Sequence, residues 1–174
     1  MDTNRTDLSE MVTLAKVFCA QVEHPDESPA QWVQELAQLL PRLQAAVVAL
    51  QTAEESQPLA ACVDPDARFE LFSRLARRLG DLDGYRLEYD DLHQDALVTG
   101  SLADDLTDIY FDLREGLNWV ARADPDHAAS VWRHSYRVHW GQHLVDANRH
   151  LYAINSKGGI PVSDNEAGQA HRAR

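Results

Sequence analysis

Apolar residues recur at steps of three and four along most of the chain, which is the pattern of amphipathic helices that share one core. The first such segment runs from Leu8 to Glu23, and the second follows Ser28 and continues to Val47. A third opens at Asp64 and reaches about Gly80, and we expect it to bury Phe69, Phe72, Leu75, Ala76 and Leu79. These segments predict three helices in the N-terminal half.

Two longer helices are predicted at Ser101–Ala123 and His127–Asn155. Only a few residues connect them, so they should pack as antiparallel neighbours. Gly116 and Gly141 lie inside these helices, where each glycine costs roughly 1 kcal/mol relative to alanine. Close approach of the two helices is the reason we expect for both. The facing sides of these two helices are called the C-terminal interface below.

Helix starts are signalled by a polar cap followed by proline, at Ser28-Pro29, Asp64-Pro65 and Asp124-Pro125. Ser101 with Asp104 resembles a capping box, in which each side chain accepts from the other's backbone N–H. Pro41 falls within the second helix and should kink or split it.

The sequence therefore predicts an all-α, single-domain helical bundle of five or six helices over residues 1–155. Gly80 to Gly100 is irregular and suggests a long loop or short helical turns, and no alternating pattern of a strand is evident. From Ser156 the chain has glycine, proline and no apolar periodicity, so residues 156–174 are predicted to be a disordered tail.

Charge is concentrated in one part of the chain. The formal net charge is −12, and Asp81 to Asp126 holds thirteen acids and three bases. This excess argues against direct binding of nucleic acid or of a membrane surface, and it suits a partner protein with a basic surface or a cation. We expect the acidic segment from Asp83 to Asp95 to contribute to that contact.

Location and assembly are less constrained. Two cysteines, Cys19 and Cys62, indicate a reduced compartment rather than a disulfide scaffold. The polar N-terminus does not resemble a signal peptide, and the longest apolar run, Ala45–Leu50, is too short to cross a membrane. We expect a cytoplasmic protein, and a homo-oligomer is compatible with the sequence.

The C-terminal interface carries the candidate chemistry. At 100° per residue, four acids flank the apolar stripe of the first helix, while His139, His143, Asp146 and His150 share one side of the second. The candidate binding residues are Asp105, Asp108, Asp112, Glu115, Trp132, Tyr136, His139, Trp140, His143 and Asp146. Histidines at i and i+4 facing carboxylates can hold zinc, iron or manganese, and the candidate ligands are His139, His143, Asp108 and Asp112.

Known motifs do not fit this arrangement. The sequence has no Glu after His139, as a zinc protease helix would, and no Glu-x-x-His of di-iron bundles. Asp81 to Gly84 resembles a calcium loop only in its acids, and no nucleophile motif occurs. Arg133, Arg137 and Arg149 interleave with the histidines and could instead neutralise the carboxylates in a structural ion-pair network. The sequence favours this structural interpretation over a bound metal.

The stretches SLADDLTDIYFDLREGL and VWRHSYRVHWGQHLVDANRHL, on Ser101–Leu117 and Val131–Leu151, are similar to a family described as domain of unknown function number 5063. The resemblance implies an all-helical, cytosolic, bacterial protein of about this length. It implies no activity, cofactor or partner.

Function is therefore predicted from the residues alone. The leading hypothesis is a non-enzymatic protein-binding factor, such as an adaptor, inhibitor or assembly factor, without a cofactor. The alternative is a helical-bundle metalloprotein or small-molecule enzyme that uses His139 and His143 with the facing aspartates. A weaker alternative is an acidic mimic of nucleic acid.

Overall fold

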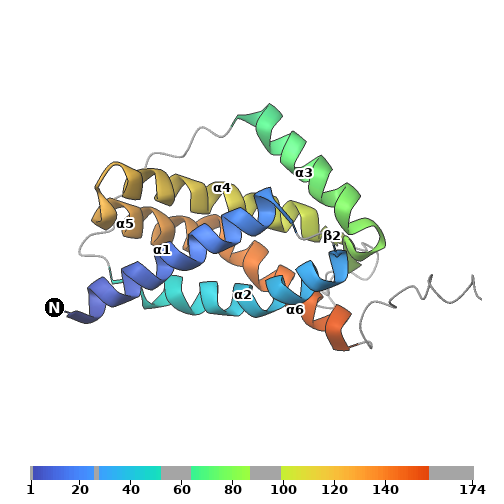
Figure 1. Ribbon diagram of the computed structural model, residues 1–174, viewed down its shortest axis with the longest axis horizontal. Coiled ribbons are helices and arrows are strands. Elements are labelled where there is room, and N and C mark those ends of the chain that lie inside the picture. Colours follow the sequence, from blue (N-terminus) through green and yellow to red (C-terminus); the bar gives the residue numbers. More distant parts are fainter. Residues whose placement is uncertain (1, 26–27, 52–63, 87–98, 157–174) are drawn as a thin grey trace, which may run out of the picture.

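The computed structural model describes residues 2–25, 28–51, 64–86 and 99–156. The predicted all-α bundle is confirmed, and Figure 1 shows its long helices side by side, with α3 lying obliquely against α4. The helices are α1 (Asp2–Glu23), α2 (Pro29–Ala49), α3 (Pro65–Leu79), α4 (Leu102–Ala121), α5 (Pro125–Ser135) and α6 (Gly141–Ser156). A single π-helical turn, η2 (Tyr136–Trp140), joins α5 to α6 without a break. Counted in this way, the described residues contain five long helices and one short 3₁₀ turn, η1 (Gly80–Leu82).

The predicted helix caps are present. In each case a side-chain oxygen accepts a hydrogen bond from a backbone N–H of the first turn: Ser28 from Gln31, Asp64 from Asp66, Ser101 from Asp104, and Asp124 from His127. The other hydrogen bond of the expected capping box, from the Ser101 backbone N–H to the Asp104 carboxylate, is wrong. That carboxylate pairs with Arg68 instead. Asp83 supplies the second cap of α4 by accepting from the backbone N–H of Ala103 at 2.7 Å.

Helix α4 is the centre of the bundle, since it contacts α1, α3, α5 and α6. It runs antiparallel to the last long helix, as predicted. The buried indole of Trp132 donates to the carbonyl of Leu113 at 3.1 Å, and His143 reaches Asp105 nearer the start of α4. Side chains of this last helix therefore meet α4 along most of its length.

The two glycines inside the C-terminal helices, Gly116 and Gly141, are required for different reasons. A Cβ on Gly116 would lie 2.1 Å from Nε1 of Trp132, so the expected close approach of the helices is confirmed there. A Cβ on Gly141 would instead lie 2.2 Å from the Tyr136 carbonyl oxygen of its own helix. The Gly141 N–H donates to that carbonyl, five residues back, which closes the π turn. Gly141 is thus required by the turn rather than by a neighbouring helix.

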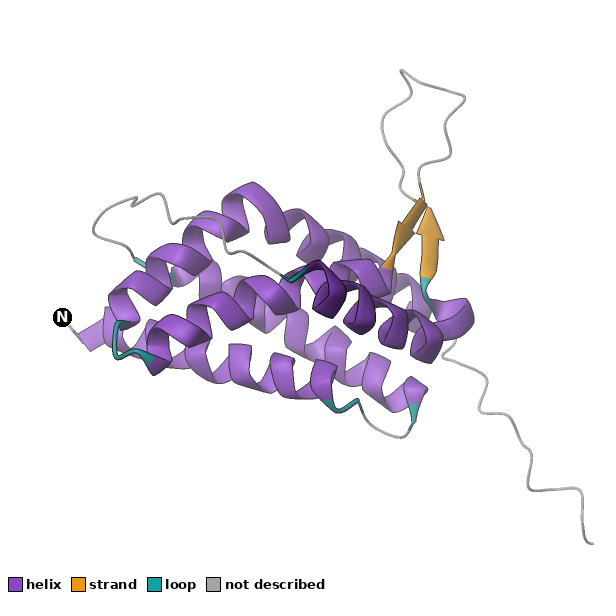
Figure 2. Cartoon of the chain, turned by 90° about the horizontal axis from the view of Figure 1, so that it is seen from above, coloured by secondary structure: helices purple, strands orange, loops and turns teal. Residues whose placement is uncertain are grey.

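A small hairpin was not predicted. Strands β1 (Gly84–Arg86) and β2 (Thr99–Ser101) pair antiparallel, with Tyr85 opposite Gly100 (Figure 2). Three residues are too few to produce a readable alternation of apolar and polar positions. The backbone N–H of Leu102 donates to the Asp83 carbonyl at 2.9 Å, which ties the hairpin to the start of α4.

Two further expectations need correction. Helix α2 continues through Pro41, so of the two expected effects of this proline, a kink or a split, the split is excluded. On α3, Leu75 and Leu79 are buried and Phe72 and Ala76 pack against the core as expected, but Phe69 is 69% exposed and Leu71 is buried instead. Among the described residues, no helix is long and apolar enough to cross a membrane. The predicted tail lies almost entirely outside the described residues, as do Cys62 and most of the acidic segment from Asp83 to Asp95.

Candidate metal centre

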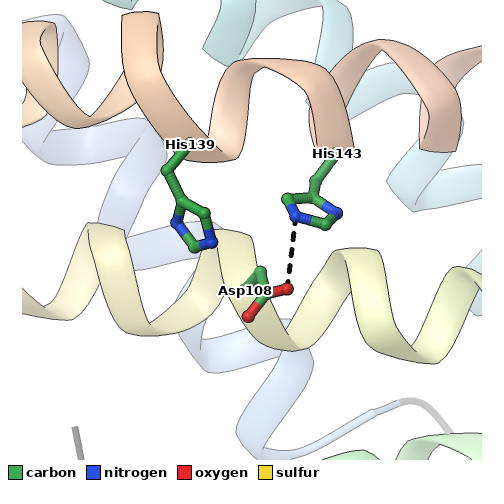
Figure 3. A group of neighbouring side chains, drawn as sticks. All are labelled: Asp108, His139 and His143. Atoms are coloured by element: carbon green, nitrogen blue, oxygen red, sulfur yellow. Dashed lines mark ion pairs between the residues drawn. The ribbon is translucent and has the colours of Figure 1, made fainter.

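His139 and His143 extend from one side of the last helix toward Asp108 on α4 (Figure 3). His139 belongs to the π turn and His143 to the first turn of α6. Residues four apart on a helix are neighbours, and the two imidazole centroids lie 5.3 Å apart, roughly edge to face. Their common orientation means that both rings can reach a single point between the helices.

Each imidazole has a carboxylate on its Nδ1 atom. His139 Nδ1 lies 2.6 Å from Asp112 Oδ2, and His143 Nδ1 lies 2.9 Å from Asp105 Oδ1. A carboxylate at this position makes Nδ1 the protonated nitrogen of a neutral ring and leaves the Nε2 lone pair available. Histidines that bind metal through Nε2 are commonly oriented in this way, by an acceptor on the other ring nitrogen.

Asp108 completes a group of three. Its Oδ2 lies 3.3 Å from the Nε2 of His143, and one ligand atom from each of Asp108, His139 and His143 lies within 4.8 Å of the others. Two ligands of a tetrahedral zinc ion with bonds of about 2.0–2.1 Å are about 3.3 Å apart, which matches the first of these separations. The side chain of His139 is 50% exposed, so its ring is less confined by packing than the side chains of His143 and Asp108.

The other oxygen of Asp108 binds Arg68 of α3. Both Nε and Nη2 of the guanidinium donate to Oδ1, at 3.0 and 2.6 Å, and Nη2 also reaches Asp104 at 3.1 Å. The Asp108 side chain is only 9% exposed. A buried carboxylate requires such a partner, because an unpaired charge is costly away from water.

The hairpin supplies a further outer partner. The hydroxyl of Tyr85 donates a hydrogen bond to Oδ2 of Asp105, the same carboxylate that orients His143. The Tyr85 ring stacks on His150 with centroids 4.6 Å apart. A Cβ on Gly100 would lie 2.3 Å from the Tyr85 ring, so glycine is needed opposite Tyr85 in the hairpin. Contacts therefore connect Tyr85 of β1 to Asp105 of α4 and on to His143 of α6. His143 in turn contacts Asp108 of α4, which binds Arg68 of α3.

The protonation preferences of the group follow from burial and from these contacts. The Asp105 hydrogen bond, aided by the charges of Asp108 and Asp105, raises the pKa of His143 despite its partial burial. Burial raises the pKa of Asp105, and it does the same for the pKa of Asp112, although each accepts a hydrogen bond from a histidine. Burial also raises the pKa of Tyr85, which keeps its hydroxyl a donor.

The group carries an excess of negative charge. Asp104, Asp105, Asp108 and Asp112 lie along one side of α4, and with Arg68 they sum to a net charge of −3 while both histidines are neutral. Carboxylates held this close attract a cation, either a proton on His143 or a metal ion. This electrostatic preference is independent of the ligand geometry.

The other predicted site residues have different hydrogen-bond partners. The Glu115 carboxylate accepts from the Trp119 indole, and Asp146 accepts from Gln142. Tyr136 accepts from Gln44 of α2, and Trp132 is buried in the core. Trp140 is also buried, and its indole donates to Ser135, which in turn hydrogen bonds to Asp112. The structure therefore brings together five of the ten candidates, Asp105, Asp108, Asp112, His139 and His143.

Two of the three expected arginine partners, Arg133 and Arg149, are not where the structural interpretation placed them. Arg133 donates to the carbonyls of Val48 and Leu50 at the end of α2, and Arg149 donates to the carbonyl of Arg86. The arginine that pairs with Asp108 is Arg68, which lies forty residues earlier in the chain. Sequence reasoning missed Arg68 and Tyr85, because neither belongs to a local pattern that points to α4.

Comparisons with known proteins support the fold and name no activity. The profile of a family described as "Domain of unknown function (DUF5063)" matches residues 3–157. The crystal structure of protein BF1032 from Bacteroides fragilis is similar, with a TM-score of 0.68 and 23% sequence identity. That similarity covers 85% of this chain and 91% of the other. No curated protein matches the chain.

Proposed function

Because the chain belongs to the family described as domain of unknown function DUF5063, whose description names no activity, we propose a function from the geometry alone. The proposal is that the protein binds a divalent transition-metal ion at the C-terminal interface. Asp108, His139 and His143 would be its ligands, through one carboxylate oxygen and two Nε2 atoms. Asp112 and Asp105 would be outer partners that orient the two imidazoles.

One observation carries the proposal: both histidines have a carboxylate on Nδ1, and Asp108 lies on their Nε2 side. One such pair is common in structural ion-pair networks. Two pairs on adjacent turns, aimed at a third carboxylate, give an arrangement that a metal ion would complete. The donor set of two nitrogens and one oxygen suits zinc, iron or manganese.

Among the described residues the group has three ligands, and this number supports a reactive site over a purely structural one. Structural zinc sites have four protein ligands, whereas catalytic sites have three and leave a position for water or substrate. A bound ion would supply Lewis acidity at that remaining position. The side chain of His139 is 50% exposed, so this position would lie near the protein surface.

The competing interpretation is that His143 is an imidazolium held between Asp105 and Asp108, with no metal involved. Titration of metal-free, untagged protein with Zn²⁺ or Co²⁺ by isothermal calorimetry separates the two. We expect one saturable site in the wild type, with affinity reduced at least about tenfold in Asp108→Asn and His139→Ala. His24→Ala is the matched control, because His24 is an exposed histidine outside the group. Equal affinity in all four proteins would contradict the proposal.

A further inference from the structure

The two oxygens of Asp108 have different partners, and this difference bears on which metal the site can accept. Oδ1 receives two N–H groups of Arg68, at 3.0 and 2.6 Å, while Oδ2 faces Nε2 of His143 at 3.3 Å. We infer that Arg68 is a specificity-determining positioning residue, which limits Asp108 to one coordinating oxygen and thereby selects transition metals over Ca²⁺ and Mg²⁺. This inference rests on the proposed function.

Arg68 is held in place by more than Asp108. It lies in the first turn of α3, where its backbone N–H donates to the carbonyl of Asp64, the cap residue of that helix. Its Nη2 also donates to Asp104, one turn before Asp108 on α4. The guanidinium is therefore fixed to two successive turns of α4, and a planar fork fixed in this way keeps Oδ1 engaged.

The consequence is a small and nitrogen-rich donor set. Ca²⁺ takes six to eight oxygen ligands, often including a bidentate carboxylate, and Mg²⁺ requires a nearly octahedral set of oxygens. With Oδ1 held by Arg68, the group offers one oxygen and two imidazole nitrogens. Zinc, cobalt, iron and manganese accept such a set, whereas the alkaline-earth ions do not.

Charge alone could not produce this selectivity. The net negative charge around Asp108 attracts every divalent cation in the same way. Removing Arg68 would raise that attraction for all ions and would also release Oδ1 as an additional hard ligand. The second effect favours Ca²⁺ and Mg²⁺ in particular, so the ratio of affinities should change as well as their values.

The test compares Arg68→Met with Arg77→Met, measuring Co²⁺ and Ca²⁺ affinity by calorimetry and the visible spectrum of the Co²⁺-bound protein. Both variants lose one positive charge from α3, and Arg77 is exposed and away from the site. In Arg68→Met the ratio of Co²⁺ to Ca²⁺ affinity should fall by about 10–100-fold. Its Co²⁺ bands should also weaken, because a second carboxylate oxygen raises the coordination number. Arg77→Met should retain the wild-type ratio and spectrum.

Other outcomes separate the two proposals. If the wild type and Arg68→Met have the same ratio of Co²⁺ to Ca²⁺ affinity and the same Co²⁺ spectrum, Arg68 only forms a structural ion pair. The inference then fails, while the proposed function stands. If the wild type binds no Co²⁺, both fail. If Arg68→Met does not fold, Arg68→Lys is measured instead. Lysine keeps the positive charge, but its ammonium lacks the planar guanidinium that directs two N–H groups onto one oxygen. Its ratio of Co²⁺ to Ca²⁺ affinity should fall below that of the wild type, and a wild-type ratio would overturn the inference.

Discussion

Nε2 of His143 lies 3.3 Å from Oδ2 of Asp108, across the contact between α6 and α4. This separation is explained equally well by a shared proton or by a shared metal ion. Asp105 on the far side of the ring accepts the Nδ1 proton in both cases. A proton and a metal ion at this point differ in how the protein responds to pH and to a chelator.

Truncation of His143 should destabilise the metal-free protein. His143→Ala leaves two buried carboxylates, Asp105 and Asp108, each without one of its partners. We expect a loss of about 1–3 kcal/mol in the free energy of unfolding, measured by urea denaturation. His24→Ala should change it by less than about 0.5 kcal/mol, as is usual for surface substitutions. If the two variants are equally stable, the contacts of His143 contribute nothing to the fold.

The metal-free protein should become less stable as pH rises above the ordinary pKa of histidine. The pKa of His143 is raised in the folded state, so its contribution is fully present below the unfolded value and is lost as pH rises through the folded value. Burial raises the pKa of Asp105 as well, and this acts with the same sign, but it begins at the lower ordinary pKa of aspartate. Urea midpoints at about pH 6 and about pH 8 should therefore decrease in that order.

His143→Gln provides the control for this pH dependence, since glutamine keeps hydrogen-bonding groups and does not titrate. Its urea midpoint should vary less with pH than that of the wild type. Added Zn²⁺ should reverse the trend in the wild type, because imidazole must lose its proton to bind metal. An identical pH dependence in both metal-free proteins would show that His143 does not control it.

Gly141→Ala should be destabilising, although alanine is normally the better helix residue by roughly 1 kcal/mol. The added Cβ would lie 2.2 Å from the Tyr136 carbonyl, so the π turn that contains His139 would have to rearrange. We expect a loss of about 0.5–3 kcal/mol together with weaker Co²⁺ binding. Gly84→Ala is the matched control, because nothing lies within 4 Å of its added Cβ. A more stable Gly141→Ala protein with unchanged Co²⁺ binding would contradict the role given to the turn.

Partner binding through the acidic segment stays a prediction. Asp83 itself is engaged in capping α4, and Asp90, Asp91 and Asp95 lie outside the described residues. Replacing these three by asparagine should slow association with a basic partner and reduce its dependence on salt, since exposed charges act mainly on the association rate. The rate is measured by stopped-flow mixing at low and at physiological salt. An unchanged rate and salt dependence would limit the segment to a role in solubility.

The fold was predictable because its signals are local. Stripes of apolar residues and polar caps such as Ser28 and Asp124 define helices without reference to the rest of the chain. The C-terminal interface was predictable for the same reason, because angular positions on two adjacent helices place His143 opposite Asp105 and Asp108.

The π turn is indicated only weakly by the sequence, through the spacing of buried residues. The prediction of one regular helix over His127–Asn155 does not take this spacing into account. Trp132, Trp140 and Leu144 are all buried, and their positions differ by multiples of four. An α-helix advances 3.6 residues per turn, so residues spaced by four drift around its axis unless a wider turn compensates. The π turn at Tyr136–Trp140 supplies such a turn.

The outer partners could not be predicted because they are not local. Arg68 meets Asp108 from a separate helix, and its position depends on how α3 crosses α4. Arg133 is predicted to pair with a carboxylate, yet it donates to two backbone carbonyls at the end of α2. Every residue has a backbone carbonyl, so the pattern of side chains does not indicate which carbonyl will be the acceptor. Tyr85 depends on a hairpin whose strands are three residues long.

The most direct test is elemental analysis of untagged protein, combined with its melting temperature before and after treatment with a chelator. We expect about one transition-metal ion per chain and a lower melting temperature after chelation, since free metal at a hundred times the dissociation constant stabilises by about 2.7 kcal/mol. Asp108→Asn should contain little metal and show no response to the chelator. Sub-stoichiometric metal in the wild type, with a melting temperature that the chelator does not change, would contradict the account and leave His143 as a structural ion pair.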